Sequence, residues 1–283
     1  MSGLGILDRL VPVDLDELDA VAALLTRRDR KYVVPTEVAA LAVERLGDAS
    51  RVLDIDGRRR FRYESVYFDT PDRISYLAAA HRRPRRFKVR TRSYLESRRC
   101  LLEIKTRDPR GRTAKERCPH AIELRDGLDR DARAFLAECH LIGGQSAILA
   151  PALTSRYARS TLLIDGEGSR VTLDEDLEAW TPDGRAIALP GMAIVETKTS
   201  GPPSEADRVL WSLGYRPARV SKFCTCLAAL RPELPSNRWT RVLRQPWRRV
   251  ARPEGSERAA PTLSVDGVEE LVHDRSGFSG VWD

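Results

Sequence analysis

Charged residues recur at every second position in six separate stretches of the chain, and the residues between them are often apolar, as at Phe87, Val89 and Ile104. A spacing of two places side chains on one face of a β-strand. Because six strands share this pattern, we predict a closed sheet with a charged interior and an apolar exterior covered by protein. The stretches are Arg27-Asp29-Lys31, Lys88-Arg90-Arg92, Glu103-Lys105, Lys115-Arg117, Arg170-Thr172-Asp174 and Glu196-Lys198.

Turn signals and helical spacing separate the strands along the chain. Leu41, Ala42 and Leu46 lie along one face of a helix, which Gly47 ends. The segment 108–111 has the Asp-Pro-Arg-Gly sequence of a hairpin turn. The pattern predicts strands at 26–34, 60–69, 86–94, 100–107, 112–118, 152–164, 169–177 and 193–199, and helices at 14–25, 36–46, 129–141, 205–213 and 221–230.

The pattern fades beyond Leu234. We therefore expect an N-terminal helical extension over residues 1–25, a main domain over 26–234 and a basic tail over 235–283. Six arginines and no acidic residue lie between Arg238 and Arg252. This tail is typical of a disordered or loosely attached extension. The alternative is a basic, aromatic segment that contacts a membrane surface, a partner or a polyanion.

Composition adds an anionic partner to this picture. The chain has 283 residues, of which 42% are hydrophobic, so it can bury a substantial core. Its net charge is +7, although charged residues of both signs make up 31% of the chain. The basic character is therefore local, as in residues 82–92, which hold seven basic residues and no acid. Such local charge favours an anionic ligand without identifying it.

The sequence also predicts a soluble, cytoplasmic protein. Its five cysteines form no CxxC pair, and we interpret them as reduced thiols. Five acidic residues within the first 25 positions do not fit the charge pattern of a signal peptide. No apolar run approaches the roughly 20 residues needed to span a bilayer.

Motifs for other common chemistries are missing from the sequence. The four histidines show no HExxH or other zinc-ligand spacing. No GxxxxGK motif and no GxGxxG motif after a strand is present, so P-loop and Rossmann nucleotide sites are not expected. Taken alone, Glu103 and Lys105 are typical of a solvated strand face. Repetition of the pattern on six strands is what favours a basic tunnel.

Eight short motifs, in order along the chain, carry a resemblance to a known family. The chain resembles the VTC domain, the polyphosphate polymerase module of vacuolar transporter chaperone complexes and their bacterial relatives. That domain belongs to the triphosphate tunnel metalloenzymes, a CYTH-like superfamily. The resemblance covers about residues 26–230 and rests on Arg27-Arg28-Asp29-Arg30-Lys31-Tyr32, Tyr67-Phe68-Asp69-Thr70, Lys88-Val89-Arg90-Thr91-Arg92, Glu103-Ile104-Lys105, Tyr157-Ala158-Arg159, Arg170-Val171-Thr172-Leu173-Asp174, Glu196-Thr197-Lys198 and Ser221-Lys222-Phe223.

The resemblance implies a fold and a set of site residues. The implied fold is α+β, a closed antiparallel β-barrel with peripheral helices and a tunnel of basic side chains. Glu196 would bind a divalent metal, Mn²⁺ or Mg²⁺, that bridges the triphosphate. A catalytic set would stabilise charge, namely Arg90, Arg92, Lys105, Arg159, Arg170, Lys198 and Lys222. A substrate-binding set would hold phosphates, namely Arg27, Lys31, Lys88, Lys115, Arg117, Tyr157 and Arg219.

The implied reaction transfers the terminal phosphate of ATP to a growing polyphosphate chain and releases ADP. Phosphoryl transfer requires positioning and charge neutralisation more than covalent chemistry from the protein. Arginine offers phosphate a planar fork of donors, and lysine offers a movable point charge. The implied partners are ATP and polyphosphate, without nucleic acid. Eukaryotic members use membrane partners to move the product, and a separate membrane partner is left open here.

The first strand departs from many hydrolytic relatives of this barrel. They carry two glutamates and a lysine at alternate positions, where this chain has Arg27, Asp29 and Lys31. The loss of one acid removes part of a second metal site and favours a polymerase over a hydrolase. Two alternatives stay open: a metal-dependent triphosphatase on the same barrel, and a non-catalytic module that binds polyphosphate or another polyanion. A nucleic-acid binder is less favoured, because few aromatic residues interleave the basic strands.

Overall fold

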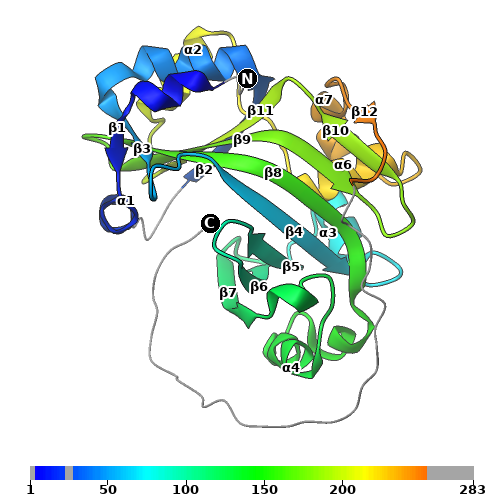
Figure 1. Ribbon diagram of the computed structural model, residues 1–283. Coiled ribbons are helices and arrows are strands. Elements are labelled where there is room, and N and C mark those ends of the chain that lie inside the picture. Colours follow the sequence, from blue (N-terminus) through cyan, green and yellow to red (C-terminus); the bar gives the residue numbers. More distant parts are fainter. Residues whose placement is uncertain (1–3, 23–27, 254–283) are drawn as a thin grey trace.

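One large sheet with helices around it organises the protein, and its strand pairs are antiparallel except for a single parallel pair near the N-terminus (Figure 1). The computed structural model describes residues 4–22 and 28–253. The fold class is therefore α+β, as predicted. The eight predicted strands and five predicted helices are present, with boundaries shifted by a few residues where these lie within the described part of the chain.

The structure adds short elements that the pattern did not predict. The strands are β1 (Val11–Val13), β2 (Arg28–Pro35), β3 (Ser50–Leu53), β4 (Phe61–Asp69), β5 (Arg86–Tyr94), β6 (Arg99–Arg107), β7 (Thr113–His120), β8 (Ala150–Ile164), β9 (Ser169–Trp180), β10 (Ala186–Leu189), β11 (Met192–Thr199) and β12 (Arg248–Arg249). The α-helices are α1 (Leu15–Ala22), α2 (Thr36–Leu46), α3 (Ile74–Ala80), α4 (Arg130–Glu138), α5 (Glu205–Ser212), α6 (Lys222–Leu230) and α7 (Thr240–Leu243). Strands β1, β3, β10 and β12 are too short to show a reliable alternation.

Eight strands form a continuous path in the order β2-β11-β9-β8-β4-β5-β6-β7. The path ends at β2 and β7, and no backbone pairing joins these two strands in the described part of the chain. The closed barrel is therefore not confirmed. The sheet nevertheless curls far enough for side chains from both ends of the path to line one cavity.

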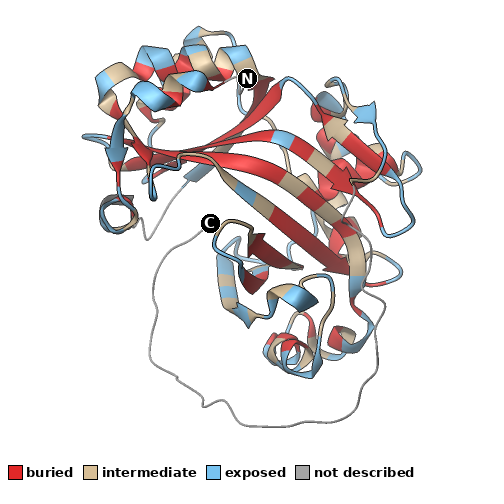
Figure 2. Cartoon of the chain, viewed as in Figure 1, coloured by how far each residue is buried: buried red, intermediate tan, exposed pale blue. Residues whose placement is uncertain are grey.

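The outer, convex face of the sheet is apolar and lies under helices, so its strand residues are mostly buried (Figure 2). Tyr32 of β2 and Val195 of β11 belong to one cluster with Leu210 of α5. Val89 of β5 belongs to another cluster with Leu136 of α4. This burial explains why apolar residues separate the charged ones along each strand.

The inner, concave face changes character along the strands. Lys31 pairs with Glu196 across β2 and β11, but two residues further on, the pair Val33 and Ile194 is apolar and packs against α6. At the opposite end of this face, Leu163 of β8 packs with residues of α1. The charged interior predicted from the sequence is thus confined to the middle of the concave face, between α6 and α1.

The segment after residue 234 is partly described. The 3₁₀ helix Asn237–Trp239 (η5), α7 and β12 fall in it, and the Trp239 side chain is only 3% exposed. Its ring lies 5.6 Å from the ring of Tyr76 in α3. For residues 235–253 the expectation of a loosely attached extension therefore does not hold, whereas residues 254–283 lie outside the described residues.

Two further observations bear on the sequence expectations. All five cysteines are free thiols, and four of them are buried. Within residues 4–22 and 28–253, every helix is too short or too polar to traverse a bilayer.

Asp207 fastens α5 to the outer face of the strands that carry Lys31 and Glu196. Its buried carboxylate accepts hydrogen bonds from Tyr32 Oη at 2.6 Å and from Thr197 Oγ1 at 2.7 Å, and it completes a capping box at the start of α5. We expect D207N to lower the free energy of unfolding by about 2–3 kcal/mol, because an amide cannot accept all of these bonds.

Chemical denaturation of the two proteins measures this difference. The matched control is D131N, since Asp131 is exposed in the first turn of α4. We expect the control to lose less than about 0.5 kcal/mol. Equal losses in D207N and D131N would contradict the anchoring role of Asp207.

Candidate functional site

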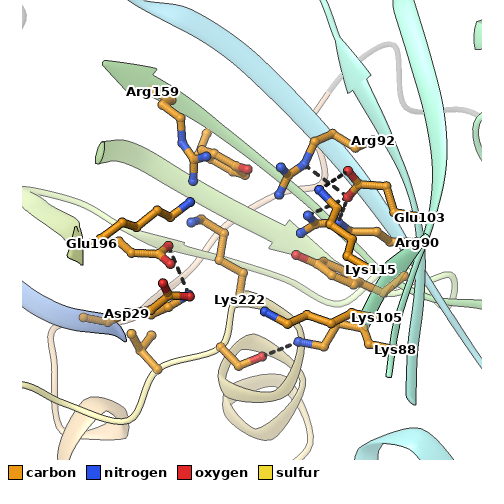
Figure 3. Close-up of a pocket in the computed structure, with 16 residues that line it drawn as sticks. Asp29, Lys88, Arg90, Arg92, Glu103, Lys105, Lys115, Arg159, Glu196 and Lys222 are labelled. Atoms are coloured by element: carbon orange, nitrogen blue, oxygen red, sulfur yellow. Dashed lines mark hydrogen bonds and ion pairs between the residues drawn. The ribbon is translucent and has the colours of Figure 1, made fainter. Parts of the chain in front are cut away.

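A cavity on the concave face gathers side chains from seven strands and from the start of α6 (Figure 3). Nine of these side chains are Lys or Arg and three are Asp or Glu, which leaves an excess of six positive charges. The cavity is lined by Asp29, Lys31, Tyr67, Lys88, Arg90, Arg92, Glu103, Lys105, Lys115, Tyr157, Arg159, Glu196, Lys198, Val220, Ser221 and Lys222.

Strand register places like charges side by side on this face. Lys88 of β5 lies opposite Lys105 of β6, which in turn lies opposite Lys115 of β7. Like charges directly opposite each other destabilise a sheet. The row of three lysines is therefore best explained by an anion that lies against it.

Glu103 is the centre of one cluster of charges. Its carboxylate accepts a hydrogen bond from Arg90 Nε at 2.6 Å and forms an ion pair with Lys115 Nζ at 2.8 Å. Burial alone would raise the pKa of Glu103, but the charges of Arg90, Arg92 and Lys115 lower it well below its ordinary value. The carboxylate is thus ionised and holds three cations in place.

Arg92, beside that cluster, has hydrogen-bond donors that no described residue satisfies. Arg92 is 4% exposed, and its Nε lies 3.9 Å from the Glu103 carboxylate, too far for a hydrogen bond. Its Nε and Nη1 atoms have no hydrogen-bond partner among the described residues. Buried donors are normally satisfied, so these two point to a ligand with oxygen acceptors.

Asp174 is the centre of a second cluster. Arg159 donates from Nε and Nη2 to its two oxygens at 2.6 and 3.0 Å, and Lys222 Nζ pairs with the same carboxylate. Burial would raise the pKa of Asp174, but Arg159 and Lys222 lower it well below its ordinary value. The Lys222 ammonium also lies 4.1 Å from the centre of the Tyr157 ring. Lys222 is therefore fixed at the cavity wall.

Asp29 and Glu196 lie together on the side of the cavity opposite Glu103 (Figure 3). The two side chains lie near each other in the cavity, and burial and then the Glu196 charge raise the pKa of Asp29. Lys31 Nζ lies 3.1 Å from Glu196 Oε2. A divalent cation would favour both carboxylates in their charged form.

The oxygen atoms of Asp29 and Glu196 are the ligand type that Mg²⁺ and Mn²⁺ prefer. Among the described residues, no three His, Cys, Asp or Glu side chains are grouped so as to hold a metal by themselves. The two carboxylates therefore fit a metal whose remaining ligands are phosphate oxygens and water, as is usual for Mg²⁺.

Lys88 has an unusual protonation equilibrium. Burial, with added repulsion from Arg90, Lys31 and Lys105, lowers the pKa of Lys88 to about 8. Its Nζ donates to Ser221 Oγ at 3.0 Å, which ties β5 to the start of α6. The site thus contains one cation whose charge is sensitive to neutral and mildly alkaline pH.

The structure brings most of the predicted site residues together. Eleven line the cavity: Lys31, Lys88, Arg90, Arg92, Lys105, Lys115, Tyr157, Arg159, Glu196, Lys198 and Lys222. Arg27 lies outside the described residues.

Three predicted residues lie elsewhere. Arg170 is buried on β9 and lies 3.7 Å from Asp19 of α1, at the edge of the charged stretch. Arg117 of β7 does not line the cavity, and its charge also acts on Asp19. Arg219 lines an adjoining cavity instead.

Asp29, Glu103 and Asp174 were not among the site residues predicted from the sequence. The structure shows that Glu103 and Asp174 each orient a group of cations, while Asp29 lies near Glu196. Their period-two spacing places them on the concave face, but only the cross-strand register shows which cation each one meets. Tyr67, which no charge pattern indicates, also lines the cavity.

Several solved structures are similar to this chain. An adenylyl cyclase candidate from Hippeastrum, described as having a dominant triphosphatase activity, is 17% identical, with 74% of this chain and 98% of that chain covered and a TM-score of 0.45. An adenylate cyclase candidate from Vibrio parahaemolyticus is 14% identical, with 69% and 94% covered and a TM-score of 0.41. The PH1819 protein from Pyrococcus horikoshii is 13% identical, with 70% and 94% covered and a TM-score of 0.40. Similarity at this level supports no inference about function.

Comparison with curated proteins gave no match. Comparison with protein families gave a match to the model of the VTC domain over residues 26–231, which include every strand that lines the cavity. Because this match spans more than half of the sequence, the chain belongs to the VTC domain family.

Proposed function

We propose that this protein is a metal-dependent polyphosphate polymerase that transfers the terminal phosphate of ATP to a polyphosphate chain held in the basic cavity. The observation that carries the proposal is the concentration of nine cations against three carboxylates on one partly enclosed face. Such a cavity is matched by a ligand with a high density of negative charge. Linear chains of phosphate meet that requirement.

The reaction needs no nucleophile from the protein. A terminal phosphate oxygen of the polyphosphate chain attacks the γ-phosphorus of ATP. The bond from that phosphorus to the oxygen bridging the β- and γ-phosphates breaks, and ADP leaves with the bond's electron pair. Arg92 would donate hydrogen bonds to the equatorial oxygens from its unsatisfied Nε and Nη1. Arg159 and Lys222, which Asp174 holds in place, would neutralise charge at the reacting phosphorus.

A divalent metal bound by Asp29 and Glu196 would neutralise phosphate charge and orient the triphosphate. In that arrangement Lys31, which is paired with Glu196, also faces the phosphates. The protein's own contribution is to keep these groups rigid. Ion pairs to Glu103 and Asp174 fix the cations before the substrate arrives, so little reorganisation is needed during the reaction.

A polyphosphate acceptor fits this cavity better than water does. The charges of Lys198, Lys105 and Lys31 act on Asp29, and Lys31 also pairs with Glu196, so cations that could hold an anionic acceptor lie beside the proposed metal ligands. The cavity also continues into a second one, with which it shares Asp29, Lys31 and Lys88 among its lining. A triphosphatase on the same sheet remains the competing activity, and product analysis separates the two.

Glu196→Gln tests the metal role. The amide retains the size of the side chain but loses the charge that attracts a divalent cation, so we expect turnover of ATP with Mn²⁺ to fall by about 100-fold or more. Chain length on a gel, ADP and free phosphate are measured together. Polymer with ADP supports a polymerase, whereas free phosphate alone, or tight polyphosphate binding without turnover, contradicts it.

The control for that experiment is Glu116→Gln, because Glu116 is exposed on β7 and does not line the cavity. It undergoes the same chemical change, and we expect activity within about twofold of the unmodified protein. Thermal unfolding of both variants shows whether the fold is retained. Full activity in E196Q would remove Glu196 from the mechanism.

The low pKa of Lys88 predicts how binding depends on pH. In the free protein Lys88 loses its charge above about pH 8. A bound phosphate chain favours the charged form and raises this pKa, so binding takes up a proton and must weaken as pH rises from 8 toward the pKa of the complex. The decrease is at most about tenfold per pH unit.

Tripolyphosphate affinities at pH 7, 8 and 9 check this dependence. K88R is the informative variant, because an arginine stays charged over the whole range. We expect the decline above pH 8 to become shallower in K88R, while changes in the ligand's own protonation affect both proteins alike. Identical pH profiles for the two proteins would show that Lys88 does not contact the ligand.

A further inference from the structure

Five arginines lie close together just outside the cavity of the candidate site, which we call the phosphate cavity from here on. We call Arg82, Arg86, Arg107, Arg219 and Arg238 the mouth cluster; together they line one cavity beside the turn of the β6–β7 hairpin. None of the five forms an ion pair with a carboxylate of the described residues. The one acid in this lining, Asp108, is already paired with Arg112 at 2.8 Å.

The arginines of this cluster act on one another. Burial and then the charges of Arg107 and Arg238 lower the pKa of Arg86. Burial and then the charges of Arg219 and Arg82 lower the pKa of Arg238. An anion between arginines that lack acidic partners would stabilise their charged guanidinium groups and reduce the repulsion between them.

A middle cavity connects the phosphate cavity to the outer cavity, which the mouth cluster lines. The middle one shares Asp29, Lys31 and Lys88 with the phosphate cavity. It shares Arg86, Arg107, Arg219 and Arg238 with the outer cavity. The basic lining is therefore continuous from the site to the surface.

Strand register explains this continuity. Lys88 and Lys105 are opposite each other on β5 and β6, and two residues nearer the turn between β6 and β7 the opposite pair is Arg86 and Arg107. Residues two apart lie on one face, about 7 Å along the strand. The rows of like charge that begin in the cavity thus extend outward without a change of face.

Arg238 comes from a segment beyond the part of the chain that matches the VTC family. Its Nη1 donates to the Ala79 carbonyl of α3 at 2.8 Å. Its neighbour Trp239 is buried against Tyr76, whose hydroxyl donates to the Pro235 carbonyl at 2.9 Å. These contacts hold the segment at the mouth and supply a cation that the domain itself lacks.

We propose that the mouth cluster is a second phosphate-binding site, which holds the part of a polyphosphate chain that extends beyond the cavity. This inference rests on the proposed function and makes it more specific. The protein would bind long chains more tightly than short ones, because only a long chain can occupy the cavity and reach the mouth cluster at the same time.

The mouth lacks the features expected for nucleic acid. The aromatic residues that line the middle cavity, Phe87 and Trp239, are 6% and 3% exposed, so they offer no open ring on which bases could stack. The outer cavity has no aromatic lining residue in the described part of the chain. A ligand made only of phosphate fits this lining better than an oligonucleotide.

The test compares binding of long-chain polyphosphate and tripolyphosphate to the full chain at fixed ionic strength. The variant is R82Q/R107Q/R238Q, which removes three mouth charges and leaves the phosphate cavity intact. We expect affinity for the long chain to fall by about tenfold, and affinity for tripolyphosphate to stay within about twofold.

Two controls accompany this variant. R99Q/R130Q/R244Q removes three exposed arginines that line none of the three cavities, so both affinities should remain unchanged. R82K/R107K/R238K keeps the charge and should recover most of the long-chain affinity. Thermal unfolding confirms that each variant folds.

Several outcomes would overturn the inference. These are equal losses of affinity for both phosphate ligands, no loss of affinity for the long chain, or the same loss in the R99Q/R130Q/R244Q control. A single-stranded oligonucleotide is measured as a third ligand, and a loss of affinity confined to it would also overturn the inference. Failure of the proposed function looks different, since the unmodified protein would then make free phosphate or show no turnover of ATP, whatever its affinities for the two phosphate ligands. Binding of both ligands by the unmodified protein with equal affinity contradicts the mouth site alone.

Discussion

Repulsion among cations that share the concave face is the constraint on which the rest of the structure depends. Nine lysines and arginines line one cavity, and the row Lys88, Lys105 and Lys115 places three of them side by side across the strands. Buried carboxylates offset only part of this charge, with Glu103 and Asp174 each holding a group of cations. The remaining excess of positive charge is what the proposed phosphate chain would offset.

Packing on the apolar outer face of the sheet offsets the repulsion among these cations. Residues that alternate with the cations pack under α2, α4 and α5, so the strands stay in register despite the repulsion on their other face. On the concave face, α6 and α1 cover the apolar ends and leave the charged middle open. Ser221 and Lys222 at the start of α6 then face the cavity, which links the cover of the sheet directly to the site.

Period-two spacing predicted the long strands and eight of the cavity residues, because alternation determines which face a side chain occupies. The other three, Tyr157, Arg159 and Lys222, were predicted only from the family resemblance. Period-two spacing could not locate the cavity along a strand. Arg170 and Arg117 follow the same alternation as Lys198 and Lys115, yet they lie toward α1 and outside the cavity. Arg238 was missed as a mouth residue, because its position depends on burial of the neighbouring Trp239 against α3. Closure of the sheet depends on how far it curls, which no local pattern encodes.

A structure determined with tripolyphosphate and a divalent metal bound would decide whether the cavity holds phosphate. We expect phosphate groups against the lysine row and the unsatisfied Arg92 donors, with the metal between the ligand and the Asp29–Glu196 pair. Phosphate bound only on the outer surface, with the cavity's ion pairs unchanged and no metal near Glu196, would contradict this expectation.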